Sequence, residues 1–230
     1  MLNMNFLALC QRLRQESGSS GSGPASVKDQ TGESKRIVDW IVAGYEDIQN
    51  FHPNWQFLQQ SFNFTMTIGK RNYTPAEAGV TNHESWKLSD YGDFRNYIDP
   101  NAQDEQYLYS IPWNEYRLNY LYGTNRTTTG RPKILSVKPD KSLDFFQIPD
   151  KAYIVDGEYY QQPDIMEENE DVPIFPSQFH LIIVWRALMF YGAYEAADER
   201  YSHGQNEYKK LLRKLEGDQL TKMTYGAPLA

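Results

Sequence analysis

The residue types that most often catalyse reactions or bind metals are few in this chain and widely spaced. None of the histidines, His52, His83, His180 and His203, lies within metal-ligand spacing of another histidine or of the single cysteine. A Cys–His nucleophile pair would need Cys10, which falls on the apolar stripe of a predicted helix and is better interpreted as a small core residue. His180 starts a predicted helix, where a residue with satisfied hydrogen bonds is favoured over a ligand. The sequence therefore argues against an enzyme, and no cofactor or metal is expected.

Two other patterns could bind ions or phosphates. Residues 164–171 contain five acidic side chains but lack the ligand spacing and central glycine of a calcium loop, so we interpret them as a solvated linker. The Gly/Ser run at 17–24 lacks the Lys-Ser/Thr pair of a phosphate-binding loop and follows a helix instead of a strand, which favours a flexible loop. No Gly-x-Ser-x-Gly elbow occurs.

Composition excludes several classes of function. With 23 Lys and Arg against 30 Asp and Glu, the net charge is −7, which argues against a sequence-independent nucleic-acid binder. One cysteine cannot form an internal disulfide, and no apolar window approaches the ~20 residues of a membrane span. The first residues have no charged region or cleavage site of a secretory signal. We therefore expect a soluble intracellular protein.

Aromatic residues are unusually common for so polar a chain. The sequence has 17 Tyr, 11 Phe and 5 Trp at a mean hydropathy of −0.69. Large amphipathic rings are typical of aromatic-rich β domains and of protein interfaces. Composition alone leaves both interpretations open.

Hydrophobic periodicity predicts two helices at each end of the chain. The N-terminal pair spans about 3–16 and 32–50, and the C-terminal pair spans about 178–194 and 199–219. Thr31, Ser177 and Asp198 are the expected N-caps, and Gly217 is expected to end the last helix. Because no single helix can bury its stripe alone, the four should form one bundle. The predicted bundle core is Phe6, Leu9, Leu13, Ile37, Trp40, Ile41, Ile48, Trp185, Leu188, Leu211, Leu212 and Leu215.

The middle of the chain predicts strands. Short alternating runs are separated by Pro, Asp and Gly, with a helical insert at about 113–122 and a hairpin turn at Asp156-Gly157. The predicted fold class is α+β: a discontinuous helical bundle with an inserted antiparallel β domain. The domains are expected at 1–54 and 164–230 for the two halves of the bundle, the second with a flexible tail, and at 55–163 for the insertion.

The last predicted helix carries a basic run of Lys209, Lys210, Arg213 and Lys214. A solvated helix face is the favoured interpretation. A contact with an acidic partner or with passing DNA is the alternative.

Three stretches of the sequence resemble a known family. They are Phe6 to Glu16 with its continuation Ser17 to Pro24, Gln30 to Glu33 leading into Ile37 to Ile41, and Phe179 to Leu188 together with Tyr208 to Leu212. As an ensemble they resemble the head–tail adaptor (connector) proteins of tailed bacteriophages. The likeness covers both helical ends and only weakly the middle.

The resemblance implies a structural virion protein that forms a ring, usually of twelve subunits, between the capsid portal and the tail. Its implied partners are other copies of itself, the portal protein, and tail, nozzle or fibre proteins. Genomic DNA would pass through the channel without specific binding, and no membrane is involved. Such a protein would lie at the head–tail junction of the virion, and in the host cytoplasm during assembly. The segment implied to contact the portal is Gly217, Asp218, Gln219, Leu220, Thr221, Lys222, Met223, Thr224, Tyr225, Gly226, Ala227 and Pro228.

The alternative from the residues themselves is a carbohydrate-binding or carbohydrate-processing module. Aromatic side chains in the predicted insertion, such as Trp86 and Trp113, could stack on sugar rings.

Overall fold

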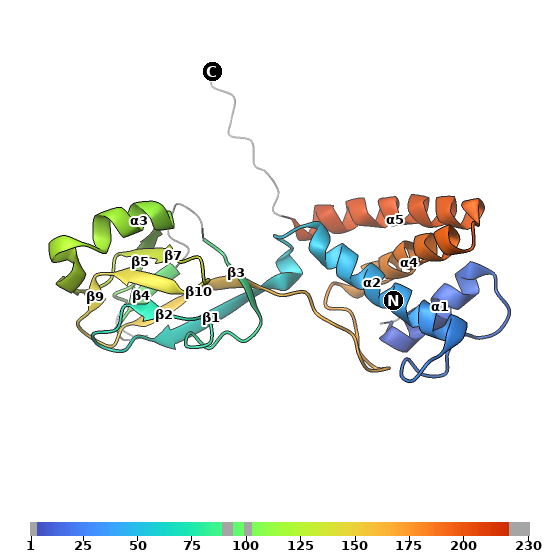
Figure 1. Cartoon of the computed structure of the whole chain (residues 1–230), viewed down its shortest axis with the longest axis horizontal. Coiled ribbons are helices and arrows are strands. Elements are labelled where there is room, and N and C mark those ends of the chain that lie inside the picture. The colour runs from blue at the N-terminus through green and yellow to red at the C-terminus, as the bar shows by residue number, and fades with distance from the viewer. Residues whose placement is uncertain (1–3, 89–93, 99–102, 221–230) are drawn as a thin grey trace, which may run out of the picture. The chain divides into compact units, whose positions relative to one another are not determined.

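The computed structural model describes residues 4–88, 94–98 and 103–220 (Figure 1). The chain divides into two compact units, a helical unit formed by 1–58 and 163–230 and a β unit formed by 59–162. The β unit is thus inserted into the chain between the two halves of the helical unit. Helices in one unit and a curled mixed sheet in the other confirm the predicted α+β class.

The helical unit is built around its most apolar helix. Its helices are α1 (Phe6–Ser17), α2 (Gly32–Phe51), α4 (Leu181–Tyr194) and α5 (Asp198–Gln219), with short 3-10 turns η1 (Gln56–Leu58) and η3 (Ser177–Phe179). Helix α4 packs against α1, α2 and α5, which explains why its sequence is apolar almost all round. Gly204 of α5 allows this helix to approach α4 closely, because a Cβ at this position would lie 3.0 Å from the carbonyl oxygen of Trp185.

Thr31 is the N-cap of α2 as predicted, whereas the other helix ends differ in detail from the predicted caps. Asn5 caps α1 by accepting a hydrogen bond from the Ala8 amide at 2.9 Å, whereas Asp198 lies in the first turn of α5 and Ala197 occupies its N-cap. Gly217 does not end α5, which continues to Gln219. A glycine inside a helix costs only about 1 kcal/mol, which the hydrogen bonds of the last turn can offset. The 3-10 turn η3, which begins at the predicted cap Ser177, precedes α4.

The acidic stretch 164–171 joins strand β10 (Ile154–Gln161) to η3 along the chain and exposes most of its acidic side chains, as predicted, but its backbone also binds the helical unit. Its carbonyl groups satisfy amides at the start of α1: the Phe6 amide donates to the Asp171 carbonyl at 2.7 Å. Gln49 binds both the amide and the carbonyl of Asp164, at 2.8 and 2.9 Å. The sequence does not reveal these contacts, because the backbone between the exposed charges makes them, and its carbonyl groups accept hydrogen bonds from free amides at a helix N-terminus.

The β unit contains one large sheet and a small one. The large sheet has the order β1 (Gln59–Thr65), β10 (Ile154–Gln161), β4 (Phe94–Tyr97), β5 (Gln106–Ser110), β7 (Ile134–Val137), β8 (Leu143–Phe146) and β2 (Asn72–Tyr73), and β3 (His83–Trp86) also pairs with β10. The small one joins β6 (Thr129–Gly130) to β9 (Ile148–Pro149).

The sheet is not wholly antiparallel as predicted, because β5 and β7 run parallel. Parallel neighbours require a crossover connection. Helix α3 (Trp113–Tyr120) and the 3-10 helix η2 (Gly123–Thr127) lie in that connection, where the helical insert was expected.

The predicted hairpin turn at Asp156-Gly157 is wrong, because both residues lie inside the continuous strand β10. The glycine is needed for packing: a Cβ at Gly157 would lie 2.3 Å from the ring of the buried Phe94. Phe94 belongs to the aromatic-rich core of the β unit, with Phe62, Phe64, Tyr73, Trp86, Phe145 and Tyr153.

Candidate interaction surfaces

Most of the predicted bundle-core residues are buried in the helical unit. Trp40 and Leu211 are instead half-buried. Leu211 lines a shallow groove together with Phe179 and Lys214, and Trp40 lies at the edge of an aromatic surface. The buried residues are Phe6, Leu9, Leu13, Ile37, Ile41, Ile48, Trp185, Leu188, Leu212 and Leu215.

Trp40 belongs to a surface cluster that we call the aromatic patch, made of Arg36, Trp40, Tyr191 and Tyr194. The Trp40 ring lies 5.9 Å from that of Tyr191 and 5.7 Å from that of Tyr194. The Arg36 guanidinium lies 4.5 Å from the centre of the Tyr194 ring, and Tyr194 is 54% exposed. Trp, Tyr and Arg are the residues that contribute most energy at protein interfaces.

The predicted portal-contacting segment lies only partly within the described residues. Gly217, Asp218 and Gln219 form the last turn of α5, and Leu220 follows it. Gly217 and Asp218 also line the groove near Leu211. The rest of the predicted segment, Thr221 to Pro228, lies outside the described residues.

The basic run on α5 is exposed at all four of its positions. One of them, Lys210, pairs with Glu207 one helical turn away at 2.5 Å. This arrangement matches the solvated face that the sequence favours.

Cys10 and three of the histidines are accounted for structurally, by burial, hydrogen bonding or ring packing. Burial raises the pKa of Cys10 to about 12, so its thiol stays protonated. His180 is buried, and its ring nitrogens lie 3.2 Å from the Met4 carbonyl and 3.0 Å from the Phe175 carbonyl. His52 contacts Glu216, and His203 packs on the ring of Trp185. Among the described residues, no three His, Cys, Asp or Glu side chains are placed to hold a metal ion.

The side chains named for sugar stacking do not form an open aromatic platform. Trp86 is buried in the β core, and its indole nitrogen donates to the Lys141 carbonyl at 2.7 Å. Trp113 is half-buried and stacks on Tyr116.

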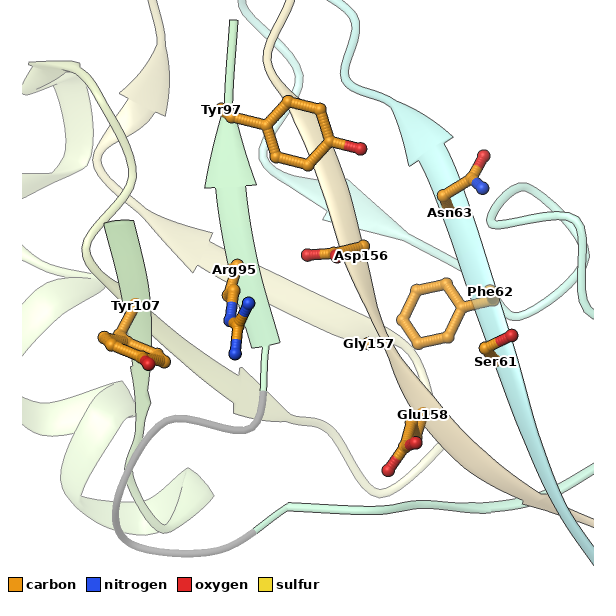
Figure 2. Close-up of a pocket in the computed structure, with 9 residues that line it drawn as sticks. All are labelled: Ser61, Phe62, Asn63, Arg95, Tyr97, Tyr107, Asp156, Gly157 and Glu158. Atoms are coloured by element: carbon orange, nitrogen blue, oxygen red, sulfur yellow. The ribbon is translucent and has the colours of Figure 1, made fainter. Parts of the chain in front are cut away.

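A different surface of the β unit is hollowed and polar. Cross-strand pairing aligns Asn63 of β1 with Asp156 of β10, Asp156 with Arg95 of β4, and Arg95 with Tyr107 of β5. These four residues, which we call the outer row, line a hollow of about 650 Å³ together with Tyr97 and Glu158 (Figure 2). Sequence reasoning missed the row, because its members come from four strands whose register local patterns do not reveal.

Both signs of charge meet in this hollow. One carboxylate oxygen of Asp156, Oδ1, is buried and has no hydrogen-bond partner among the described residues. Desolvation raises the pKa of Asp156, an effect that the nearby Arg95 opposes. The Arg95 guanidinium lies 5.2 Å from the centre of the Tyr107 ring. The hydrogen bond from Lys87 to Glu158, at 2.6 Å, lowers the pKa of Glu158.

In the part of the chain that the structure describes, no helix is long and apolar enough to cross a membrane. No curated protein matches the sequence significantly. A profile of the SU10 adaptor protein family matches residues 4–230, nearly the whole chain and both of its units. This match confirms the resemblance read from the helical ends, and the chain belongs to the SU10 adaptor protein family, a family of phage adaptors.

Proposed function

We propose that this phage adaptor, a structural component of the virion, forms a ring of twelve subunits that joins the capsid portal to the tail and leaves a channel for DNA. The observation that carries the proposal is the family match over residues 4–230. The structural role follows from the family. Ring size, portal binding and passage of DNA are the parts that experiment must test.

The aromatic patch supports contact between neighbouring subunits. Trp40 and Tyr194 expose ring surface on the helical unit, and Arg36 lies against one of those rings. Burying such surface against a second copy would use the side chains that dominate protein interfaces. We propose that the patch lies in the contact between adjacent subunits, and that the buried residues of the four helices keep it rigid.

The segment from Gly217 to Pro228 is proposed to bind the portal. Its first residues extend α5 and line a groove with Phe179 and Leu211. The β unit, as the inserted domain, is proposed to face tail, nozzle or fibre proteins at the head–tail junction.

The net charge of −7 suits a channel through which DNA must slide. A basic lumen would release counterions from the DNA and hold it, whereas an acidic protein repels the phosphates. On this proposal the DNA passes without specific binding.

Co-sedimentation with tailless, portal-bearing capsids tests the proposal. The full chain should sediment with the capsids, and the variants Trp40→Ala and Tyr194→Ala should bind more weakly, because a ring engages the portal through many subunits at once. Tyr194 is largely exposed, so its variant keeps the fold even if Trp40→Ala does not. Lys209→Ala/Lys210→Ala, on the exposed basic run of α5, is the matched control. A chain that never sediments with capsids would refute the proposal.

A further inference from the structure

We propose that the hollow on the β unit binds a neutral oligosaccharide, with the outer row supplying its hydrogen bonds and Tyr97 and Tyr107 supplying its stacking surface. This inference goes beyond the adaptor role and does not depend on it. The residues that carry it come from β1, β10, β4 and β5, all within one unit (Figure 2).

The hollow offers hydrogen-bonding groups to a ligand. Asp156 lines the hollow with a carboxylate that is half-buried, yet its Oδ1 has no partner within the described part of the chain. Leaving a buried acceptor unsatisfied costs free energy, so such groups usually have a structural or functional explanation. A hydroxyl of a ligand in the hollow would reach this carboxylate from its exposed side, since Asp156 is one of the lining residues. Figure 2 shows the Asp156 carboxylate extending from β10 towards β4, where Arg95 offers donors for the ligand's oxygen atoms.

The hollow also offers aromatic ring surface. Tyr107 lines the hollow and is 53% exposed, so part of its ring is open to a ligand there. The Arg95 guanidinium lies over the Tyr107 ring and limits its movement. Tyr97 is half-buried on the same strand as Arg95, two residues away, and so lies on the same face of the sheet. The apolar C–H face of a hexose can pack on such rings while its hydroxyl groups reach the neighbouring polar side chains.

Charge selects a neutral ligand. The carboxylates Asp156 and Glu158 are balanced by Arg95 and by Lys87, which is paired with Glu158. Arg95, in the centre of the outer row, would repel a basic peptide, and the two carboxylates would repel an acidic polymer. A molecule with many hydroxyl groups and no net charge meets neither repulsion.

Size and shape agree with this class of ligand. The hollow of about 650 Å³ lies within the range of roughly 300–1,000 Å³ that is common for small-molecule sites. The sheet beneath is held by cross-strand pairing on both sides of β10, so the site is formed before the ligand arrives.

Saturation-transfer NMR on the full chain tests the inference with named probes. The probes are maltohexaose, cellohexaose, mannohexaose and chitohexaose at millimolar concentration, with hexa-lysine as a cationic comparison. We expect at least one of the sugars to bind, and we expect Asp156→Asn and Tyr107→Ala each to weaken that binding about tenfold, the effect of losing one good polar or stacking contact. Tyr122→Ala is the control, since Tyr122 is 55% exposed and lies outside the hollow.

Three outcomes would overturn the inference: no sugar of the panel binds, the variants bind like the wild type, or hexa-lysine binds in place of the sugars. Circular dichroism of each variant establishes that it is folded. Assembly with the portal is expected to be unchanged in Tyr107→Ala, so a failure here is distinct from a failure of the adaptor proposal.

Discussion

The phenol of Tyr116 on α3 donates a hydrogen bond of 2.7 Å to the carboxylate of Asp144 on β8, and both groups are almost fully buried. Arg71 completes the arrangement, since its Nη2 donates to the Tyr116 oxygen at 2.7 Å and its Nε to Asp144 at 2.8 Å. Burial raises the pKa of Tyr116, so the phenol remains a donor. This network holds the crossover between the parallel strands β5 and β7 against the sheet.

Tyr116→Phe should destabilise the β unit by about 1–3 kcal/mol, because it leaves buried hydrogen-bonding groups of Arg71 and Asp144 short of a partner. The free energy of unfolding in urea measures the effect. Tyr122→Phe removes an exposed hydroxyl and is expected to change stability by less than about 0.5 kcal/mol. Equal stability of the two variants would show that the network contributes little.

The protein should become less stable as the pH falls from about 6.5 to about 4, because His83 becomes protonated more readily in the unfolded chain than in the folded one. Desolvation, with a smaller effect of Lys141, lowers the pKa of His83 to about 4, while Glu84 opposes the shift. In the unfolded chain the His83 ring binds a proton near pH 6.5, whereas in the folded protein it does so only near pH 4. Between these two pH values protonation favours the unfolded state, and below pH 4 the whole contribution of His83 to stability is lost. Both ring nitrogens of His83 lack partners among the described residues, so the neutral ring is favoured.

The variant His83→Phe removes this dependence. We expect it to reduce the stability lost between pH 7 and pH 4 by about 2 kcal/mol, measured by urea denaturation at each pH. Desolvation also lowers the pKa of His180, so this histidine keeps a pH dependence of the same sign in the variant. The same loss of stability in wild type and variant would contradict the assignment to His83.

Gly157→Ala should destabilise the β unit, because its new methyl group would overlap the Phe94 ring. Overpacking of a buried site costs about 1–3 kcal/mol. Gly217→Ala is the opposite case: nothing in the described part of the chain lies within 4 Å of its new methyl group, and α5 is expected to gain about 0.5–1 kcal/mol. Thermal unfolding of both variants distinguishes them, and a stable Gly157→Ala would contradict the close packing.

The four helices could be predicted from the sequence because their information is local. The stripe of Leu9 and Leu13 predicts α1, and the continuous apolar run after Leu181 predicts a helix covered on most sides, as α4 is. Trp40 lies on such a stripe as well but remains half-buried, because periodicity does not tell how far a neighbour covers it.

The β unit is harder to predict from the sequence, because the contacts that shape it join residues far apart in the chain. Asp-Gly is a strong turn signal, but at Gly157 the packing of Phe94 from another strand decides the conformation. The outer row depends on the register of four strands, and the hydrogen bond between Tyr116 and Asp144 joins residues from two elements. A single sequence does not reveal such pairings.

Removal of residues 221–230 should weaken binding to the portal while leaving the helical unit folded. The described helices end before this segment, and α5 closes its last turn with a hydrogen bond from the Leu220 amide to the Glu216 carbonyl at 3.0 Å. Capsid co-sedimentation and thermal unfolding measure the two effects. Undiminished binding would refute the proposed role of the C-terminal segment.

Native mass spectrometry of the chain incubated with purified portal protein is the most direct test of the adaptor proposal. The proposal predicts a closed complex in which one portal carries twelve copies of the chain. A chain that remains strictly monomeric, with and without the portal, would contradict it.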